Sequence, residues 1–273
     1  MNEKNRPIGV FDSGVGGISV LKKVVQQLQH ENFIYYGDSL NAPYGSKPLD
    51  EVRQLTIDGV NFLLDRNVKA LVVACNTATS AAIDEIRAMH SDLPVIGTEP
   101  ALKPAVLSTS SGSIVVMATE RTLVEKKFSL LMDKVARERD VIKMSCPGLV
   151  ELIEDGKAHA VEASDYLKDK FSSIDLSTVS AVVLGCTHYP FIRGALADVI
   201  GEDIRILDSA DGIAKHLNNV LKEKDLLTDR TTPGEVQIIN SSADDKLLNL
   251  SVRLLISELC KEDVLEDLLC VSG

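Results

Sequence analysis

The chain has 273 residues, of which 45% are apolar and 25% charged, as in an ordinary soluble globular protein. Its net charge of −11 argues against nucleic acid or an anionic membrane surface as a partner, because both attract clustered Lys and Arg. No run reaches the ~20 apolar residues that cross a bilayer. Five irregularly spaced cysteines argue against a disulfide framework. We therefore expect a cytoplasmic protein of one large or two modest domains.

Predicted strands and helices alternate over the first hundred residues. Short apolar runs predict buried strands at 8–11, 33–36, 70–74 and 94–97. Apolar residues at helical spacing predict helices at 18–28, 49–66 and 76–89.

Two connections in this part of the chain are candidates for ligand binding. The glycine-rich turn from Asp12 to Gly17 lacks the fingerprints of a P-loop and of a dinucleotide site; its N–H groups either hold an anion or belong to a plain connection. The loop 37–48 follows a strand, where loops often carry binding residues, and a solvent-facing connection is the alternative.

The same pattern returns after the Pro-rich crossing at 98–104. Strands are predicted at 113–117, 141–144, 180–185 and 204–207, and helices at 123–137 and over most of 149–171. A last strand at 236–239 and a helix at 246–259 are assigned back to the first block. The resulting domains are 1–97 plus 209–273, and 98–208.

Cys75 and Cys186 each end an apolar strand and precede a polar residue that begins a helix. They lie at nearly the same distance from the polar turns at Asp12 and Thr119, which suggests a duplication. Open α/β sheets bind ligands at such strand ends, and the helix dipole there favours a thiolate. Neither feature applies to the other three cysteines, which we expect only to pack; they are Cys146, Cys260 and Cys270.

Several kinds of chemistry could use such thiols. The spacing for a metal site and the C-x-x-C of a redox site are both absent, and we expect no metal. A hydrolase with Cys186 as nucleophile and His188 as base would leave Cys75 unexplained. A module that binds a carboxylate without turnover is a further alternative. Two-base proton transfer uses both thiols, because inverting a carbon centre requires proton removal from one face and delivery to the other.

Such a reaction needs groups that hold an amino acid. Hydroxyls, amides and turn N–H groups could stabilise the substrate carboxylate as charge flows into it. Asp12 could hold an ammonium group, and Asp12 and His188 could each tune a neighbouring thiol. The candidate donors are Ser13, Asn76, Thr77, Thr119 and Thr187.

Five motifs together resemble the bacterial glutamate racemases. They are Asp12–Gly17, Tyr36–Asp38, Pro43–Gly45, Ala74–Thr79 and Gly185–Pro190. The resemblance implies a cofactor-independent racemase that interconverts L- and D-glutamate for peptidoglycan synthesis. It also implies an α/β fold of two pseudo-symmetric, Rossmann-like parallel-sheet domains with the active site between them, and a homodimer.

The resemblance also implies roles for single residues. Cys75 would deprotonate D-glutamate, Cys186 would act on L-glutamate, and Glu154 would assist, although Glu151 stands where a proline is common. The implied substrate contacts are Asp12, Ser13, Tyr44, Gly45, Asn76, Thr77, Thr119, Thr187 and His188. An aspartate racemase of the same superfamily remains an alternative, because the residues alone do not set the length of the substrate side chain.

Overall fold

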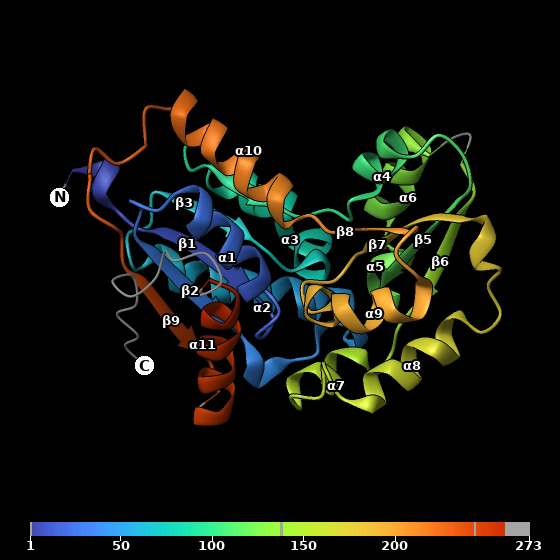
Figure 1. Ribbon diagram of the computed structural model, residues 1–273. Coiled ribbons are helices and arrows are strands. Elements are labelled where there is room, and N and C mark those ends of the chain that lie inside the picture. Colours follow the sequence, from blue (N-terminus) through green and yellow to red (C-terminus); the bar gives the residue numbers. More distant parts are fainter. Residues whose placement is uncertain (1, 137–138, 243, 260–273) are drawn as a thin grey trace. The chain divides into compact units, whose positions relative to one another are not determined.

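Helices and strands alternate along most of the chain in the computed structural model, which describes residues 2–136, 139–242 and 244–259 (Figure 1). Contacts divide the chain into two compact units, each built on a parallel sheet as predicted. Unit 1 comprises 1–98 with 210–273, and unit 2 comprises 99–209. That these units are independent domains with the boundaries expected from the sequence stays a prediction.

Unit 1 has a five-stranded sheet in which every pairing is parallel, in the order β4-β3-β1-β2-β9. The strands are β1 (Ile8–Asp12), β2 (Phe33–Gly37), β3 (Ala70–Val73), β4 (Val95–Gly97) and β9 (Val236–Asn240). All residues of β1 and β3 are buried, as expected for strands that helices cover on both faces.

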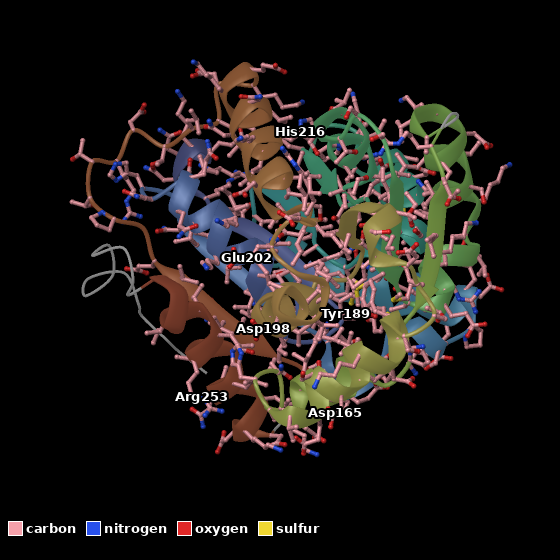
Figure 2. The ribbon with its side chains drawn as sticks, turned by 45° about the vertical axis from the view of Figure 1, so that its right-hand side comes forward. Asp165, Tyr189, Asp198, Glu202, His216 and Arg253 are labelled. Carbon is pink, nitrogen blue, oxygen red and sulfur yellow. The ribbon has the colours of Figure 1, made fainter. Side chains whose placement is uncertain are left out.

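Helices pack against one another in two groups on this sheet (Figure 1). One group contains α1 (Ile18–Gln27), α10 (Ala210–Glu223) and α11 (Asp245–Leu259), and the other contains α2 (Leu49–Leu64) and α3 (Asn76–Met89). Short 3₁₀ turns complete the unit at Glu3–Asn5, Ser39–Asn41 and Tyr44–Ser46. Each α-helix buries one apolar stripe, and exposed polar residues such as His216 on α10 and Arg253 on α11 lie outside it (Figure 2).

Unit 2 has a four-stranded parallel sheet in the order β6-β5-β7-β8. Its strands are β5 (Ser113–Ala118), β6 (Val141–Ser145), β7 (Val179–Leu184) and β8 (Arg205–Leu207). Its helices are α4 (Leu102–Ser108), α5 (Glu120–Val124), α6 (Lys126–Val135), α7 (Leu149–Glu154), α8 (Val161–Phe171) and α9 (Arg193–Ile200), with 3₁₀ turns at Leu176–Thr178 and Tyr189–Ile192. Alternate residues of β5 face two hydrophobic clusters, one with α4–α6 and one with α7–α9.

The two sheets share one topology. Read from one edge, the first four strands of unit 1 are ordered β4-β3-β1-β2, and those of unit 2 are ordered β8-β7-β5-β6. In each unit the chain runs from the first strand to a neighbour on one side and then crosses to the other side. The topological switch point therefore lies between β1 and β3 in unit 1, and between β5 and β7 in unit 2, which is where such sheets bind ligands.

Two helical segments differ from the expectation. The helix α4 begins inside the Pro-rich segment 98–104, where we expected only a crossing between the two blocks. Pro104 lies in the first turn of this helix, where proline is tolerated because its missing N–H would have no intrahelical partner. The predicted helix 123–137 is two helices, because Glu125 is extended. The prediction that most of 149–171 is helical is confirmed by α7 and α8, and α7 ends at a turn in which Gly156 has φ +79°.

Candidate functional site

Cys75 and Cys186 hold the same position in the two sheets. The N–H of Ala74 donates to the Phe11 carbonyl at 2.8 Å, and the N–H of Gly185 donates to the Met117 carbonyl at 2.7 Å. In both units this is the last bond between the first and third strands, and the cysteine follows it. Both thiols therefore lie at a topological switch point, on the carboxyl edge of a parallel sheet.

Cys75 caps the N-terminus of α3 with its sulfur. The N–H of Ala78 donates to Cys75 Sγ at 3.4 Å, and Ser13 Oγ lies 3.3 Å from the same sulfur. The residue is 6% exposed. A helix N-terminus and a hydroxyl both stabilise negative charge, so this environment favours a thiolate that can act as a base.

Asp12 ends β1 and is fully buried beside the turn that carries Ser13. The Asp12 carbonyl accepts a hydrogen bond from the N–H of Asp38 at 2.9 Å, which joins the ends of β1 and β2. A Cβ on Gly17 would lie 2.5 Å from the Cβ of Asp12, so only glycine lets the turn fold back so closely. The turn thus places a carboxylate on the same sheet edge as Cys75.

Tyr44 approaches this edge from the loop after β2. Its hydroxyl donates to Asp38 Oδ2 at 2.6 Å, and the amide of Asn41 donates to both oxygens of the same carboxylate. Burial, followed by the bond to Asp38 and the charges of Cys75 and Asp12, raises the pKa of Tyr44, so it remains a neutral donor. Gly45 follows it in the same 3₁₀ turn.

Asp38 was absent from the predicted site residues. A sequence signal was available, since an acidic residue within two positions of the predicted strand 33–36 belongs to the same sheet edge as Asp12. The hydrogen bond from Tyr44 to Asp38 could not be predicted from the sequence, because it depends on how the loop 37–48 folds back.

Asn76 and Thr77 are the first two residues of α3, and both are buried. Among the described residues, Asn76 Oδ1 has no hydrogen-bond partner. A buried acceptor without a partner is costly in a folded protein, and it commonly marks a place where a ligand donates. The backbone N–H groups of the first helical turn have no intrahelical acceptors and suit an anion. This helix start can therefore hold both poles of an amino acid.

Cys186 lies next to a buried imidazole in unit 2. Cys186 Sγ is 3.8 Å from His188 Nδ1, and His188 Nε2 is 2.8 Å from Glu154 Oε1. Burial lowers the pKa of His188, but its bonds to Cys186 and Glu154 outweigh burial and raise that pKa well above its usual value. A protonated imidazole stabilises a thiolate, so the contacts from Glu154 to His188 to Cys186 suit a cysteine that transfers protons. They would equally suit a nucleophilic cysteine.

The two threonines predicted in unit 2 lie on the same sheet edge. Thr119 follows β5 as Ser13 follows β1; its hydroxyl caps α5 by accepting from the N–H of Thr122 at 3.3 Å. Thr187 is buried beside Cys186. Each unit therefore gathers its own set of predicted residues: Asp12, Ser13, Tyr44, Gly45, Asn76 and Thr77 with Cys75, and Thr119, Glu154, Thr187 and His188 with Cys186.

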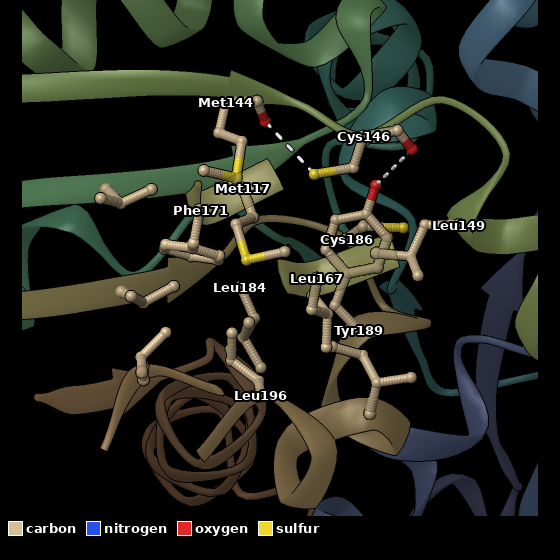
Figure 3. Packing of buried hydrophobic residues seen from close by; sticks show 14 of the residues in the cluster. Met117, Met144, Cys146, Leu149, Leu167, Phe171, Leu184, Cys186, Tyr189 and Leu196 are labelled. Atoms are coloured by element: carbon tan, nitrogen blue, oxygen red, sulfur yellow. Dashed lines mark hydrogen bonds between the residues drawn. The ribbon is translucent and has the colours of Figure 1, made fainter. Parts of the chain in front are cut away.

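Cys146 belongs to the hydrophobic cluster of unit 2 (Figure 3). Its thiol donates to the Met144 carbonyl at 3.6 Å, and the Tyr189 hydroxyl donates to the Cys146 carbonyl at 3.4 Å. Burial raises the pKa of Cys146 to about 12, so it remains a thiol at neutral pH. Cys260 and Cys270 lie outside the described residues.

Two searches of the described residues add to this account. No group of three or more His, Cys, Asp or Glu side chains within them has the arrangement of a metal site. Their helices are also too short or too polar to cross a membrane.

The chain is similar to known racemases over most of its length. The sequence model of the Asp/Glu/Hydantoin racemase family matches residues 8–217. A glutamate racemase of Clostridium acetobutylicum is 54% identical over 93% of this chain and 99% of its own length, and one of Clostridium botulinum is 50% identical over the same shares.

Solved structures agree with the sequence comparison. A glutamate racemase of Bacillus anthracis aligns with a TM-score of 0.81 and 29% identity, covering 92% of this chain and 94% of its own. A glutamate racemase of Francisella tularensis in complex with D-glutamate aligns with a TM-score of 0.80 and 28% identity, covering 99% and 98%. That of Escherichia coli, in complex with L-glutamate and an activator, aligns with a TM-score of 0.79 and 29% identity, covering 91% and 95%.

Proposed function

The chain belongs to the glutamate racemases of the Asp/Glu/hydantoin racemase family, and from this premise we propose that it interconverts L- and D-glutamate by two-base proton transfer. In this proposal Cys75 and Cys186 act on opposite faces of one α-carbon. No cofactor takes part. Relatives bound to D-glutamate and to L-glutamate support the choice of substrate.

The reaction moves two protons. Starting from D-glutamate, the Cys75 thiolate removes the α-proton, and the electron pair of the C–H bond moves into the α-carboxylate. The Cys186 thiol then gives its proton to the other face of the carbon, which yields L-glutamate and leaves Cys186 as a thiolate. The L-isomer runs the same steps in reverse, with Cys186 as base and Cys75 as acid.

The observation that carries this proposal is the equivalence of the two cysteines. Each follows the third strand of the same sheet motif, and each has a partner that favours its thiolate: the Ser13 hydroxyl for Cys75, and the His188 imidazole for Cys186. A reaction that alternates between two bases requires such a matched pair. A Cys–His hydrolase would use only the Cys186 side and leave Cys75 and its capped helix without a role.

The remaining site residues are proposed to hold the substrate. The N–H groups at the start of α3, with Thr77, would take a carboxylate and stabilise charge that flows into it. Asp12 would accept from the ammonium group, and so would Asn76 Oδ1, for which residues 2–136, 139–242 and 244–259 supply no other partner. The other proposed contacts are Ser13, Tyr44, Gly45, Thr119, Thr187 and His188.

The experiment is incubation with L-glutamate in D₂O without added cofactor. We expect D-glutamate to form with deuterium at the α-carbon, because the incoming proton comes from a thiol that has exchanged with solvent. L-Aspartate in a parallel reaction should stay unchanged; turnover of aspartate alone would identify an aspartate racemase. Binding of glutamate without α-proton exchange would favour the carboxylate-binding module. The absence of both glutamate binding and α-proton exchange would contradict the proposal.

Three further parts of the proposal concern the setting of the enzyme. The D-glutamate would supply peptidoglycan synthesis. A cytoplasmic location would keep both catalytic cysteines reduced. The homodimer implied by the sequence resemblance is tested by analytical ultracentrifugation, where a monomer at all concentrations would contradict it.

A further inference from the structure

The turn that carries Asp12 and Ser13 is held in place from the neighbouring strand. Tyr35 lies opposite Val10 in the parallel pairing of β2 with β1 and is fully buried. Its hydroxyl donates to the Gly14 carbonyl at 2.6 Å. A single phenol in the sheet therefore reaches the backbone of the turn.

Two glycines leave room for this ring. A Cβ on Gly37 would lie 2.4 Å from the Gly14 oxygen and 3.1 Å from Cε1 of Tyr35. A Cβ on Gly17 would lie 3.0 Å from Cε2 of the same ring. A side chain at either position would displace the ring or the turn. The packing of the Tyr35 ring against the turn therefore requires glycine at both positions.

The Gly14 carbonyl, which accepts the Tyr35 hydrogen bond, is one residue away from the contact with the Cys75 thiol. Ser13 directly precedes Gly14, and its Oγ lies 3.3 Å from Cys75 Sγ. The equivalent strand position in unit 2, opposite Val116, is Lys143, which is exposed. The support by a buried phenol is thus specific to the Cys75 side.

We propose that Tyr35 is a positioning residue for proton transfer at Cys75, an inference that rests on the proposed racemisation. Tyr35 acts through the Gly14 carbonyl, which fixes the direction of the Ser13 hydroxyl toward the sulfur. Loss of the phenol hydroxyl lets the turn shift, weakens the Ser13 contact and makes the Cys75 thiolate less favourable. Steps at Cys186 are unaffected.

The first test measures thiol reactivity and needs no turnover. In Tyr35→Phe, alkylation of Cys75 by iodoacetamide at neutral pH should slow by about fivefold, the size expected for one lost hydrogen bond. Peptide masses should show an unchanged rate at Cys186. Tyr36→Phe is the matched control: it removes a phenol hydroxyl from the next residue, on the opposite face of the strand, and should leave both rates unchanged. An unchanged rate at Cys75 in Tyr35→Phe would overturn the proposal.

The second test uses isotope effects during racemisation. In Tyr35→Phe the primary deuterium isotope effect should increase with D-[2-²H]glutamate, because removal of that deuterium by Cys75 becomes more rate-limiting. The effect should decrease with L-[2-²H]glutamate, whose deuterium Cys186 removes. A loss of folded enzyme would lower kcat and change neither isotope effect, and that result would contradict a positioning role.

A second substitution tests the route through Ser13. Ser13→Ala should itself slow alkylation at Cys75 selectively, and adding Tyr35→Phe should slow it no further, because the two residues act in series. Additive effects would overturn this route, and so would a normal rate in Ser13→Ala. If the unaltered enzyme failed to racemise glutamate, the proposed function would fall, while the alkylation rates would still decide the role of Tyr35.

Discussion

His188 Nε2 lies 2.8 Å from Glu154 Oε1, in a contact that joins the turn after β7 to the end of α7. This bond and the one to Cys186 overcome the effect of burial, and together they raise the pKa of His188. His188 therefore stays protonated at neutral pH and becomes neutral only as the pH rises through its raised pKa. Activity that depends on the imidazolium should be present below that pKa and lost above it.

The first prediction concerns the carboxylate in this pair. Glu154→Gln removes the negative charge that favours the imidazolium, so the alkaline limb of the kcat–pH profile should move to lower pH. We expect kcat at neutral pH to fall about tenfold, the size of a lost charged hydrogen bond. Glu151→Gln, which changes an exposed residue in the first turn of the same helix, is the control and should leave the profile unchanged. An unshifted limb in Glu154→Gln would contradict the assigned role.

The second prediction concerns the Asn76 amide, whose Oδ1 has no hydrogen-bond partner within the described part of the chain. Asn76→Ala should raise the KM for glutamate by about fivefold to thirtyfold, because one bond to the substrate is lost. It should not lower the melting temperature, since it removes a buried acceptor that has no hydrogen-bond partner among the residues that the structure describes. Asn219→Ala, on an exposed position of α10, should change neither quantity. A lower melting temperature with an unchanged KM would assign Asn76 a structural role.

The third prediction separates Cys146, which packs in the core, from the two cysteines proposed to be catalytic. Cys146→Ala should keep kcat within about twofold and cost about 1 kcal/mol of stability, a typical value for a small buried truncation. Its thiol should also be alkylated more slowly than the other two, because burial raises its pKa to about 12. Steady-state kinetics and urea unfolding of Cys146→Ala check its kcat and stability, and peptide masses after alkylation of the unaltered enzyme check the reactivity of the thiol. Loss of activity without loss of stability would place Cys146 in the mechanism.

The fourth prediction concerns a buried ion pair whose lysine, Lys69, directly precedes β3, at the other end of that strand from Cys75. Lys69 contacts the Glu31 carboxylate and the carbonyls of Lys4 and Leu226, and the Lys69 and Glu31 side chains are almost fully buried. Lys69→Met leaves Glu31 as an uncompensated charge and should cost about 3–5 kcal/mol of unfolding free energy. Adding Glu31→Gln should recover most of this loss, and urea unfolding measures both. Equal stability of the single and double variants would contradict the ion-pair explanation.

The strands and the two thiol positions were predictable from the sequence because each depends on local signals. An apolar run predicts a buried strand, and the residue that ends it lies on the carboxyl edge of the sheet. Cys75 and Cys186 were found in this way, as was Asp12. The break between α5 and α6 had no comparable signal, because neither glycine nor proline stands at or next to Glu125 to mark it.

Contacts between segments that are distant in the chain could not be predicted from local sequence signals. Glu154 entered the predicted site only through a family resemblance, and its bond to His188 depends on how α7 packs in unit 2. The bonds from Tyr35 to Gly14 and from Tyr44 to Asp38 each need a side chain to reach a particular backbone or loop. Such contacts follow from the three-dimensional arrangement and leave no periodic pattern in the sequence.

The most direct test of the two-base account is α-proton exchange in D₂O by variants that keep one cysteine. Cys75→Ala should introduce deuterium into L-glutamate only, and Cys186→Ala into D-glutamate only, because the remaining thiol takes and returns protons on one face. Neither variant should form the opposite enantiomer. Racemisation at the unaltered rate by either variant, or exchange of the same enantiomer by both, would contradict the account.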